Sequence, residues 1–231
     1  MSRLLAIARL QALGRRDGAL WPLVVLSIAF VVNLAIFGAA AGAFDSKPVT
    51  GGLASIYITS LIFGAVAIVQ QFPFALGLSV TRREFSAALG LFVLVQSLGF
   101  AVLLVILQAV EDATDGWGLR LRFFGLGFVD DYGVPAQLLI YAVPLLLMTL
   151  IGIAFGVVYV RWKVNGLFAV LAAVLLVPGI AVALITRAAS WPSIGHWLAD
   201  RSALTLFAAL PLGPALLLAL LSWVTLRRAT A

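Results

Sequence analysis

The chain lacks cysteine altogether and contains little charge. Its 231 residues include no Cys and one His, which excludes disulfides, thiol catalysis and metal sites built from Cys or from several His side chains. Only 10% of the residues are charged, whereas soluble domains carry about 25%. No soluble catalytic domain of useful size fits in such a chain, so an ATPase or kinase activity would have to belong to a separate polypeptide.

The chain contains six long apolar segments, none with a charge in its interior. They cover residues 19–42, 52–74, 87–110, 135–159, 166–186 and 202–226. A bilayer core about 30 Å thick requires roughly 20 apolar residues of helix, and a charge at the centre of such a helix costs about 2.5–3.5 kcal/mol. The sequence therefore predicts an all-α membrane protein, with six transmembrane helices in a single domain, 1–231. The first segment is longer than the apolar core of a signal peptide, so we expect a retained helix.

The distribution of charge predicts how the chain crosses the membrane. If the N-terminus, the connections 75–86 and 160–165 and the C-terminus share one side, that side holds ten basic and two acidic residues, and the other side holds five basic and seven acidic ones. Because cytoplasmic loops are enriched in Lys and Arg, we expect both termini in the cytoplasm. Residues 1–18 are then either a positively charged orientation signal or a helix lying in the inner membrane interface.

The connection 75–86 is longer than a turn between two helices requires. Thr81 and Glu84 have the spacing of a capping box, with Thr81, or alternatively Ser79, capping a short helix. This predicts an ordered cytoplasmic connection with Arg82, Arg83 and Phe85 exposed. Such a connection is either a basic orientation loop or a docking element for a cytoplasmic partner.

Several other positions carry structural expectations. Asn33 is strongly polar within its apolar segment, so it should face another helix or an aqueous path. Gly152 and Gly156 have the small-xxx-small spacing that allows close helix contact, and residues 161–163 predict a tight basic turn. The outer loop 111–134 is acidic and rich in aromatic residues, which we expect at the membrane interface, with a lid or substrate funnel as the alternative.

The chain carries no recognisable catalytic or energy-coupling parts. Gly77-Leu78-Ser79 lacks the following glycine of an intramembrane serine protease, and the apolar segments contain no Asp for an aspartyl protease. There is no nucleotide-binding motif of the Walker type and no metal-ligand cluster. Ion-coupled transporters place ionisable groups within the membrane, and their absence here indicates that any transport energy comes from outside the chain.

Residues 74–85, Phe-Ala-Leu-Gly-Leu-Ser-Val-Thr-Arg-Arg-Glu-Phe, resemble the connection between helices two and three of small bacterial ABC exporter permeases of the type-2 class. The C-terminal stretch 222–229 and the general layout are also similar to these permeases. The layout comprises a basic N-terminal segment, six helices and a connector before the last helix. The acidic, aromatic loop 111–134 has no counterpart that we can match to the family.

The resemblance implies a transport subunit without enzymatic activity. The connection after helix two would be a coupling helix seated in a separate ATP-binding subunit, with Thr81, Arg82, Arg83, Glu84 and Phe85 forming the contact. ATP and Mg would be bound by that partner, so this chain would hold no cofactor and no metal. A second permease copy would complete the transporter in the bacterial plasma membrane, and membrane lipid, not nucleic acid, would surround it.

The same resemblance places helices two and five on a central export path, with Gln70 and Gln71 at its inner mouth and Asn33 as a further candidate path residue. An uncharged path favours an amphipathic or lipid-like substrate, such as a drug, a peptide or a glycolipid. Two other functions fit six helices at this length. One is the substrate-binding membrane subunit of an energy-coupling-factor vitamin uptake system, and the other is a membrane assembly or immunity protein that transports nothing.

Overall fold

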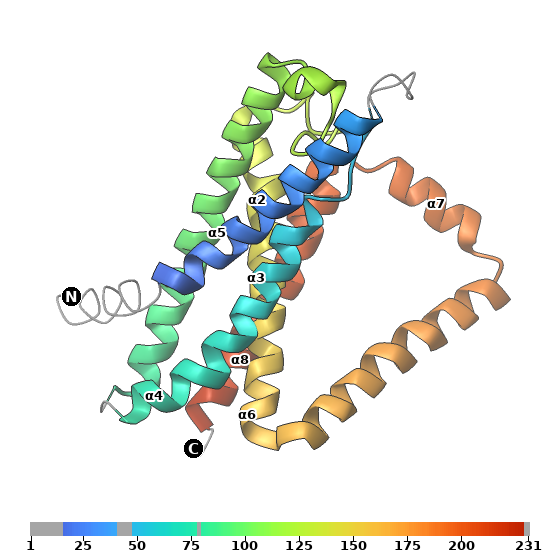
Figure 1. The fold of residues 1–231 in the computed structure, drawn as a ribbon. Helices are drawn as coiled ribbons and strands as arrows, with labels where there is room; N and C mark the ends of the chain where they lie inside the picture. Colours follow the sequence, from blue (N-terminus) through green and yellow to red (C-terminus); the bar gives the residue numbers. More distant parts are fainter. Residues whose placement is uncertain (1–15, 41–47, 78–79, 229–231) are drawn as a thin grey trace.

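A computed structural model describes residues 16–40, 48–77 and 80–228 as an assembly of helices (Figure 1). The elements in chain order are α2 (Arg16–Ala39), α3 (Ala54–Val66), η1 (Ala67–Gln71), α4 (Phe72–Gly77), α5 (Arg82–Ala113), η2 (Gly116–Arg120), α6 (Val134–Arg187), α7 (Trp191–Ala199), η3 (Thr205–Ala209) and α8 (Leu210–Arg228). The described part contains no β-strand, only an isolated bridge between Val49 and Arg122. The predicted interfacial segment 1–18 lies almost entirely outside the described residues.

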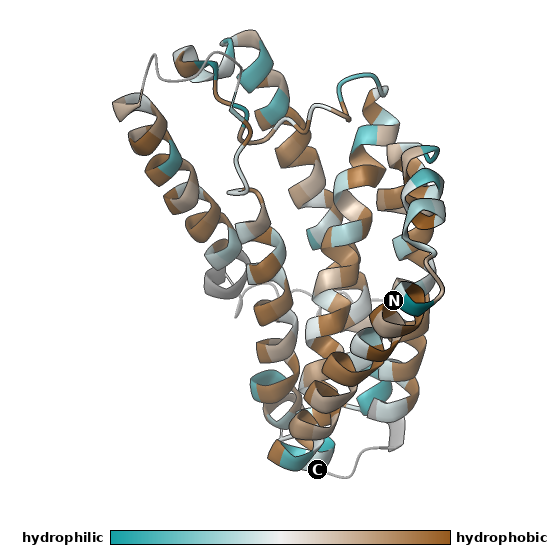
Figure 2. Cartoon of the chain, turned by 90° about the vertical axis from the view of Figure 1, so that its right-hand side faces the viewer, coloured by the Kyte–Doolittle hydropathy of each residue, from teal (hydrophilic) through white to brown (hydrophobic). Residues whose placement is uncertain are grey.

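Five helices are long and apolar enough to cross a membrane. They are Leu20–Ala39, Ala54–Gly77, Arg82–Ala113, Val134–Arg187 and Thr205–Thr225. Hydrophobic residues dominate these helices along most of their length (Figure 2). The described chain is thus an all-helical membrane protein by the length and composition of its helices.

The fourth and fifth apolar segments of the prediction, residues 135–159 and 166–186, lie in α6, which is interrupted between them. A straight helix of its 54 residues would be about 80 Å long, far longer than the membrane core. At Lys163 the backbone leaves the helix, with φ 54° and ψ −146°, in a region that glycine alone adopts readily. Figure 1 shows the chain reversing there. The predicted tight turn at residues 161–163 is confirmed, and we call residues 134–162 the first arm and residues 164–187 the second arm of α6.

The boundaries around the second connection differ from those predicted. The connection was expected to cover residues 75–86, but α4 remains helical to Gly77 and α5 begins at Arg82. Pro73 does not end the helix. It is the second residue of α4, directly after the π-helical segment η1. The capping motif at Thr81 starts α5 itself and not a separate short helix, since α5 continues without interruption from Arg82 to Ala113.

Glycines bring α3 and the first arm of α6 into close contact. A Cβ on Gly152 would overlap the carbonyl oxygen of Leu61, and one on Gly64 would overlap the carbonyl oxygen of Thr149. A Cβ on Gly156 would lie 2.8 Å from Cβ of Ile68. The close helix contact expected from Gly152 and Gly156 is confirmed, with Gly64 as its counterpart on α3.

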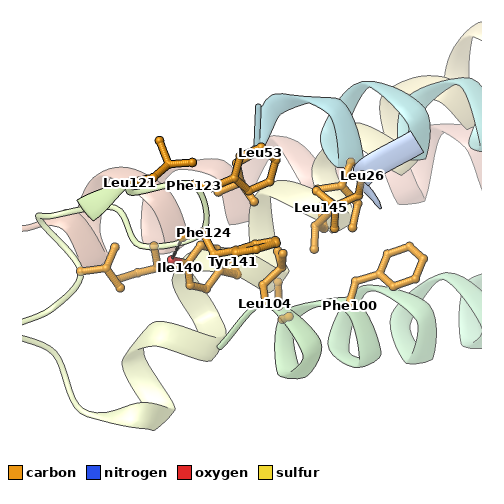
Figure 3. Packing of buried hydrophobic residues seen from close by; sticks show 14 residues of the cluster. Leu26, Leu53, Phe100, Leu104, Leu121, Phe123, Phe124, Ile140, Tyr141 and Leu145 are labelled. Atoms are coloured by element: carbon orange, nitrogen blue, oxygen red, sulfur yellow. Dashed lines mark hydrogen bonds between the residues drawn. The ribbon is translucent and has the colours of Figure 1, made fainter. Parts of the chain in front are cut away.

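Two apolar clusters fill the bundle, one toward each end. The first joins α2, α5 and the first arm of α6 through Leu26, Leu104, Tyr141 and Leu145, together with the rings of Phe123 and Phe124 (Figure 3). The second lies at the opposite end and contains Phe72, Phe85, Ile153 and Val157, among others. Aromatic pairs and interdigitated aliphatic side chains therefore hold both ends of the bundle together.

The second arm of α6 stands away from the bundle (Figure 1). Its large side chains are exposed along its whole length, among them Phe168, Leu175, Val177 and Leu184. A helix that is apolar on every face is stable only in lipid or against a protein partner. This arm therefore presents its surface to the membrane or to another chain.

The two ends of the bundle differ in charge. Arg82, Arg83, Arg161 and Lys163 lie at the end where α4 stops, α5 starts and α8 ends (Figure 1). We call this the basic end. The opposite end carries the segment between α5 and α6, residues 114–133, which we call the cap, and which is rich in Asp.

Candidate functional site

The connection between α4 and α5 is held by a complete capping box. The backbone N–H of Glu84 donates to Oγ1 of Thr81 at 3.2 Å, and the backbone N–H of Thr81 donates to Oε2 of Glu84 at 3.1 Å. The Thr81 hydroxyl also donates to that carboxylate at 2.8 Å. These bonds satisfy two of the N–H groups that the first turn of a helix leaves without partners. The predicted capping box is confirmed, and it fixes where α5 begins.

The side chains after Thr81 divide between the surface and the core. Arg83 is exposed, and Arg82 is half-buried. Phe85 is only 1% exposed and packs edge-on against Phe72 of α4, with ring centroids 5.4 Å apart. The expectation that Phe85 is exposed is wrong, because it begins the buried stripe of α5. It anchors the basic residues to the bundle and offers no surface to a partner.

Removing the N-cap of α5, Thr81, should lower the thermal stability of the protein measurably. Thr81→Ala deletes the hydroxyl that accepts from Glu84, and a lost N-cap costs about 0.5–2 kcal/mol. Thr81→Ser keeps the hydroxyl and should leave stability nearly unchanged. The measurement is thermal unfolding of both variants in the same detergent. Equal midpoints for the two variants would show that the capping bonds add nothing to stability.

The three predicted path residues do not lie together. Gln70 is exposed and Gln71 half-buried, both in η1 toward the basic end. Asn33 lies toward the cap end, near Gly52, and donates to the carbonyl of Ala29 at 2.8 Å. An amide bonded to its own helix in this way satisfies one of its N–H groups locally. Asn33 therefore does not join the two glutamines in one site.

The most highly organised polar group of the bundle is Glu111, which sequence reasoning passed over. It lies near the end of α5 and is 1% exposed. Its Oε2 accepts from the indole N–H of Trp117 at 3.0 Å and from the backbone N–H of Phe123 at 2.9 Å. Its Oε1 accepts from the N–H of Gly125 at 2.8 Å, and both oxygens are within reach of the N–H of Phe124. One carboxylate thus organises much of the cap around itself.

A second set of polar contacts ties the cap to α5 and α6. The hydroxyl of Tyr141 lies 2.8 Å from Oε1 of Gln108 and 2.9 Å from the carbonyl of Phe124. The amide of Gln108 donates to Asp130 at 3.1 Å, and Asp130 pairs with Arg122 at 2.7 Å. The hydrogen bond that Arg122 donates to Asp130 raises the pKa of Arg122 above its usual value. Tyr141 and Gln108 are buried, and buried polar groups with satisfied partners specify one arrangement.

The cap also touches the ends of the other helices. Phe30 of α2 packs on Trp117, with ring centroids 4.9 Å apart. The backbone of Arg122 exchanges hydrogen bonds with Pro48 and Thr50, just before α3. The hydroxyl of Tyr132 accepts from the N–H of Ala203, before α8, at 3.1 Å. The cap therefore joins α2, α3, α5, the first arm of α6 and α8 at one end.

The aromatic residues of the cap are not where the sequence analysis placed them. Phe123 and Phe124 are 1% and 3% exposed and pack on each other at 4.7 Å. The expectation that they lie at the membrane interface is wrong for these two rings, because Glu111 draws their backbone into the bundle. Phe128 remains 44% exposed and stacks on Phe207. The sequence shows only that Glu111 and Asp112 directly follow an apolar run, and this pattern does not reveal the partners of Glu111.

No family model, no curated protein and no solved structure matches this chain. Among the residues described, no group of three or more His, Cys, Asp or Glu side chains could hold a metal ion. The geometry thus offers two features for function. One is the basic end, where Arg82 and Arg83 follow the N-cap of α5 and precede the buried Phe85. The other is the cap, where the carboxylate of Glu111 binds N–H groups of the chain itself.

Proposed function

We propose that the chain is the permease subunit of a bacterial ATP-binding-cassette exporter of the type-2 class. It would lie in the plasma membrane with both termini in the cytoplasm. It would cross the membrane six times, with the two arms of α6 as separate crossings. A separate ATP-binding subunit would supply the energy, and a second permease copy would complete the transporter.

The observation that carries the proposal is the construction of the basic end. Arg82 and Arg83 directly follow a rigid N-cap, and Phe85 ties their turn to Phe72 inside the bundle. A force applied to these arginines would reach α4 as well as α5, because Phe85 of α5 packs on Phe72 of α4. A coupling element between an ATPase and a permease requires this rigidity. Thr81 and Glu84 would support the coupling contact by fixing the first turn of α5, whereas Phe85 would support it from inside the bundle.

The charge difference between the two ends supports the proposed orientation. The basic end gathers Arg82, Arg83, Arg161 and Lys163, whereas the cap carries three Asp and two Arg residues. Because positive residues are retained on the cytoplasmic side, the basic end would face the cytoplasm, where an ATP-binding subunit is located. An amphipathic or lipid-like substrate fits a bundle whose membrane-spanning surfaces carry no charge.

Reversing the charge of the two arginines should release the ATP-binding subunit. In Arg82→Glu with Arg83→Glu, the partner should be lost from affinity purifications in mild detergent, because attractive contacts become repulsive ones. The control reverses Arg187 and Arg201, two exposed arginines beside α7, and should retain the partner. Mass spectrometry identifies the partner by its nucleotide-binding motif.

The outcomes of this experiment separate the candidate functions. A subunit with a Walker motif that is lost in the first variant and kept in the control supports the exporter. Co-purification of a different membrane subunit together with ATPases would point to an uptake system. Recovery of the chain alone, repeated in lipid nanodiscs, would overturn the proposal.

A further inference from the structure

A short helix, α7, joins the second arm of α6 to the last of the apolar helices that are long enough to cross a membrane. Together with the second arm it stands away from the bundle (Figure 1). None of its residues is buried, and the side chains of Trp191, Trp197 and Leu198 are 48%, 43% and 45% exposed. An isolated helix of this length is marginal in water. Its apolar side chains therefore require a cover that the described part of the chain does not supply.

The residues of α7 divide between an apolar face and a polar face. Trp191, Ile194 and Leu198 follow the spacing i, i+3, i+7, so they share one face of the helix. Ser193 and His196 lie on the opposite face, because each residue of an α-helix turns the chain by about 100°. The structure therefore presents an amphipathic helix whose apolar face is not buried by any residue described.

Both ends of α7 are tied to places where apolar helices end. The indole N–H of Trp191 donates to the hydroxyl of Thr186 at 3.0 Å, one residue before the second arm ends at Arg187. Beyond α7, the N–H of Ala203 donates to the hydroxyl of Tyr132 in the cap at 3.1 Å, just before the last apolar helix begins. A helix that crosses the membrane ends at the level of the lipid headgroups. These two contacts therefore hold α7 at that level.

The size and composition of α7 favour a lipid surface over a protein partner. Its apolar face has three large side chains, which fall well short of the roughly 800 Å² that each partner buries in a stable protein interface. Tryptophan is enriched where the membrane meets water, and α7 contains two of the six in the chain. The exposed Arg187 and Arg201 flank the helix. Because charged groups are costly within hydrocarbon, they keep its ends from sinking into the membrane core.

We propose that α7 lies in the membrane interface of the leaflet at the cap end, with Trp191, Ile194 and Leu198 inserted among the lipids. Ser193 and His196 face the water. Helices of this kind bury their apolar face about 5–10 Å into the boundary between headgroups and acyl chains. The proposal rests on the proposed separate membrane crossings of the two arms of α6. It depends neither on the ATP-binding subunit nor on a substrate.

The experiment uses the absence of cysteine, which allows a nitroxide spin label to be attached at one introduced Cys. The labelled full chain is reconstituted in phosphatidylcholine liposomes, and collisions of the label with oxygen and with a water-soluble nickel chelate are measured. Oxygen concentrates in hydrocarbon and the chelate stays in water, so the ratio of the two collision rates reports the surroundings of the label. Labels at Ile194→Cys and Leu198→Cys should favour oxygen. Labels at Ser193→Cys and His196→Cys should favour the chelate.

References and matched variants complete the test. Val177→Cys, at an exposed position within the second arm, reports whether that arm crosses the membrane, and Asp131→Cys, exposed in the cap, is the reference for water. In a second step, Leu198→Glu should move the label at residue 194 toward the chelate, because a carboxylate on the apolar face opposes its insertion. Ser193→Glu places the same group on the polar face and should leave that label in lipid.

Each result decides the proposal. Alternation between the two faces, with oxygen favoured at residue 177, supports it. If all four labels on α7 favour the chelate while residue 177 favours oxygen, α7 lies in water and the proposal is wrong. Labels at residues 194 and 198 that collide with neither reagent would show a protein partner, such as a second copy, and would overturn the lipid contact. A label at residue 177 that favours the chelate would overturn the crossing of the second arm, and with it the placement of α7.

Discussion

Replacing Glu111 by glutamine should release the cap from the bundle. The carboxylate accepts hydrogen bonds from N–H groups of Trp117, Phe123, Phe124 and Gly125. Glutamine replaces one of the two carboxylate oxygens by an NH₂ group, which donates hydrogen bonds. At least one of the buried N–H groups around residue 111 would then face another donor and lose its acceptor. Loss of a buried, charge-assisted network of this kind costs about 2–5 kcal/mol. We expect a lower unfolding temperature and a cap that opens well before the rest of the chain unfolds.

Hydrogen exchange measured by mass spectrometry locates the effect. The amides of Phe123, Phe124 and Gly125 should exchange at least about thirtyfold faster in Glu111→Gln, since each 1.4 kcal/mol changes an opening equilibrium tenfold. Peptides from α3 should change little. The control is Asp131→Asn, which makes the same chemical change at an exposed position of the cap. If Asp131→Asn and Glu111→Gln behave alike, the carboxylate of Glu111 does not organise the cap.

The features that sequence predicted here all depend on neighbours close along the chain. The apolar segments, the capping box of Thr81 and Glu84, and the turn at Lys163 are set by residues within a few positions. The spacing of Gly152 and Gly156 is also local, and it identified one side of the helix contact correctly. Gly64, the counterpart on α3, lies 88 residues before Gly152, and no pattern within either segment relates the two.

The features that sequence missed depend on long-range contacts. Phe85 was expected at the surface because it was assigned to the cytoplasmic connection 75–86, yet the stripe of Phe85, Leu89 and Val93 faces the core. The role of Glu111 could not be read, because its partners lie six to fourteen residues away in a segment without regular periodicity. A carboxylate after an apolar run is typical of a helix end in water. Only the folded cap shows that its partners are backbone N–H groups.

Gly152→Leu should destabilise the bundle more than any other single change at a glycine in α6. The added side chain would have to occupy the position of the Leu61 carbonyl, and the next nearest atoms also belong to the backbone of α3. A backbone cannot move aside as a flexible side chain can, so α3 must separate from α6. Overpacking in a close-packed interior costs about 1–3 kcal/mol and occasionally more, and we expect the upper end of this range or beyond.

The matched control for this change is Gly99→Leu. Gly99 lies in the middle of α5, is exposed, and a Cβ there meets no atom within 4 Å. Leucine has a better helix propensity than glycine by nearly 1 kcal/mol, so this variant should be as stable as the wild type or slightly more stable. Thermal unfolding in one detergent compares the two substitutions, with Gly152→Ala as an intermediate step. A midpoint for Gly152→Leu equal to that of Gly99→Leu would mean that α3 and α6 are not in backbone contact at this position. The close glycine contact between them would then have to be abandoned.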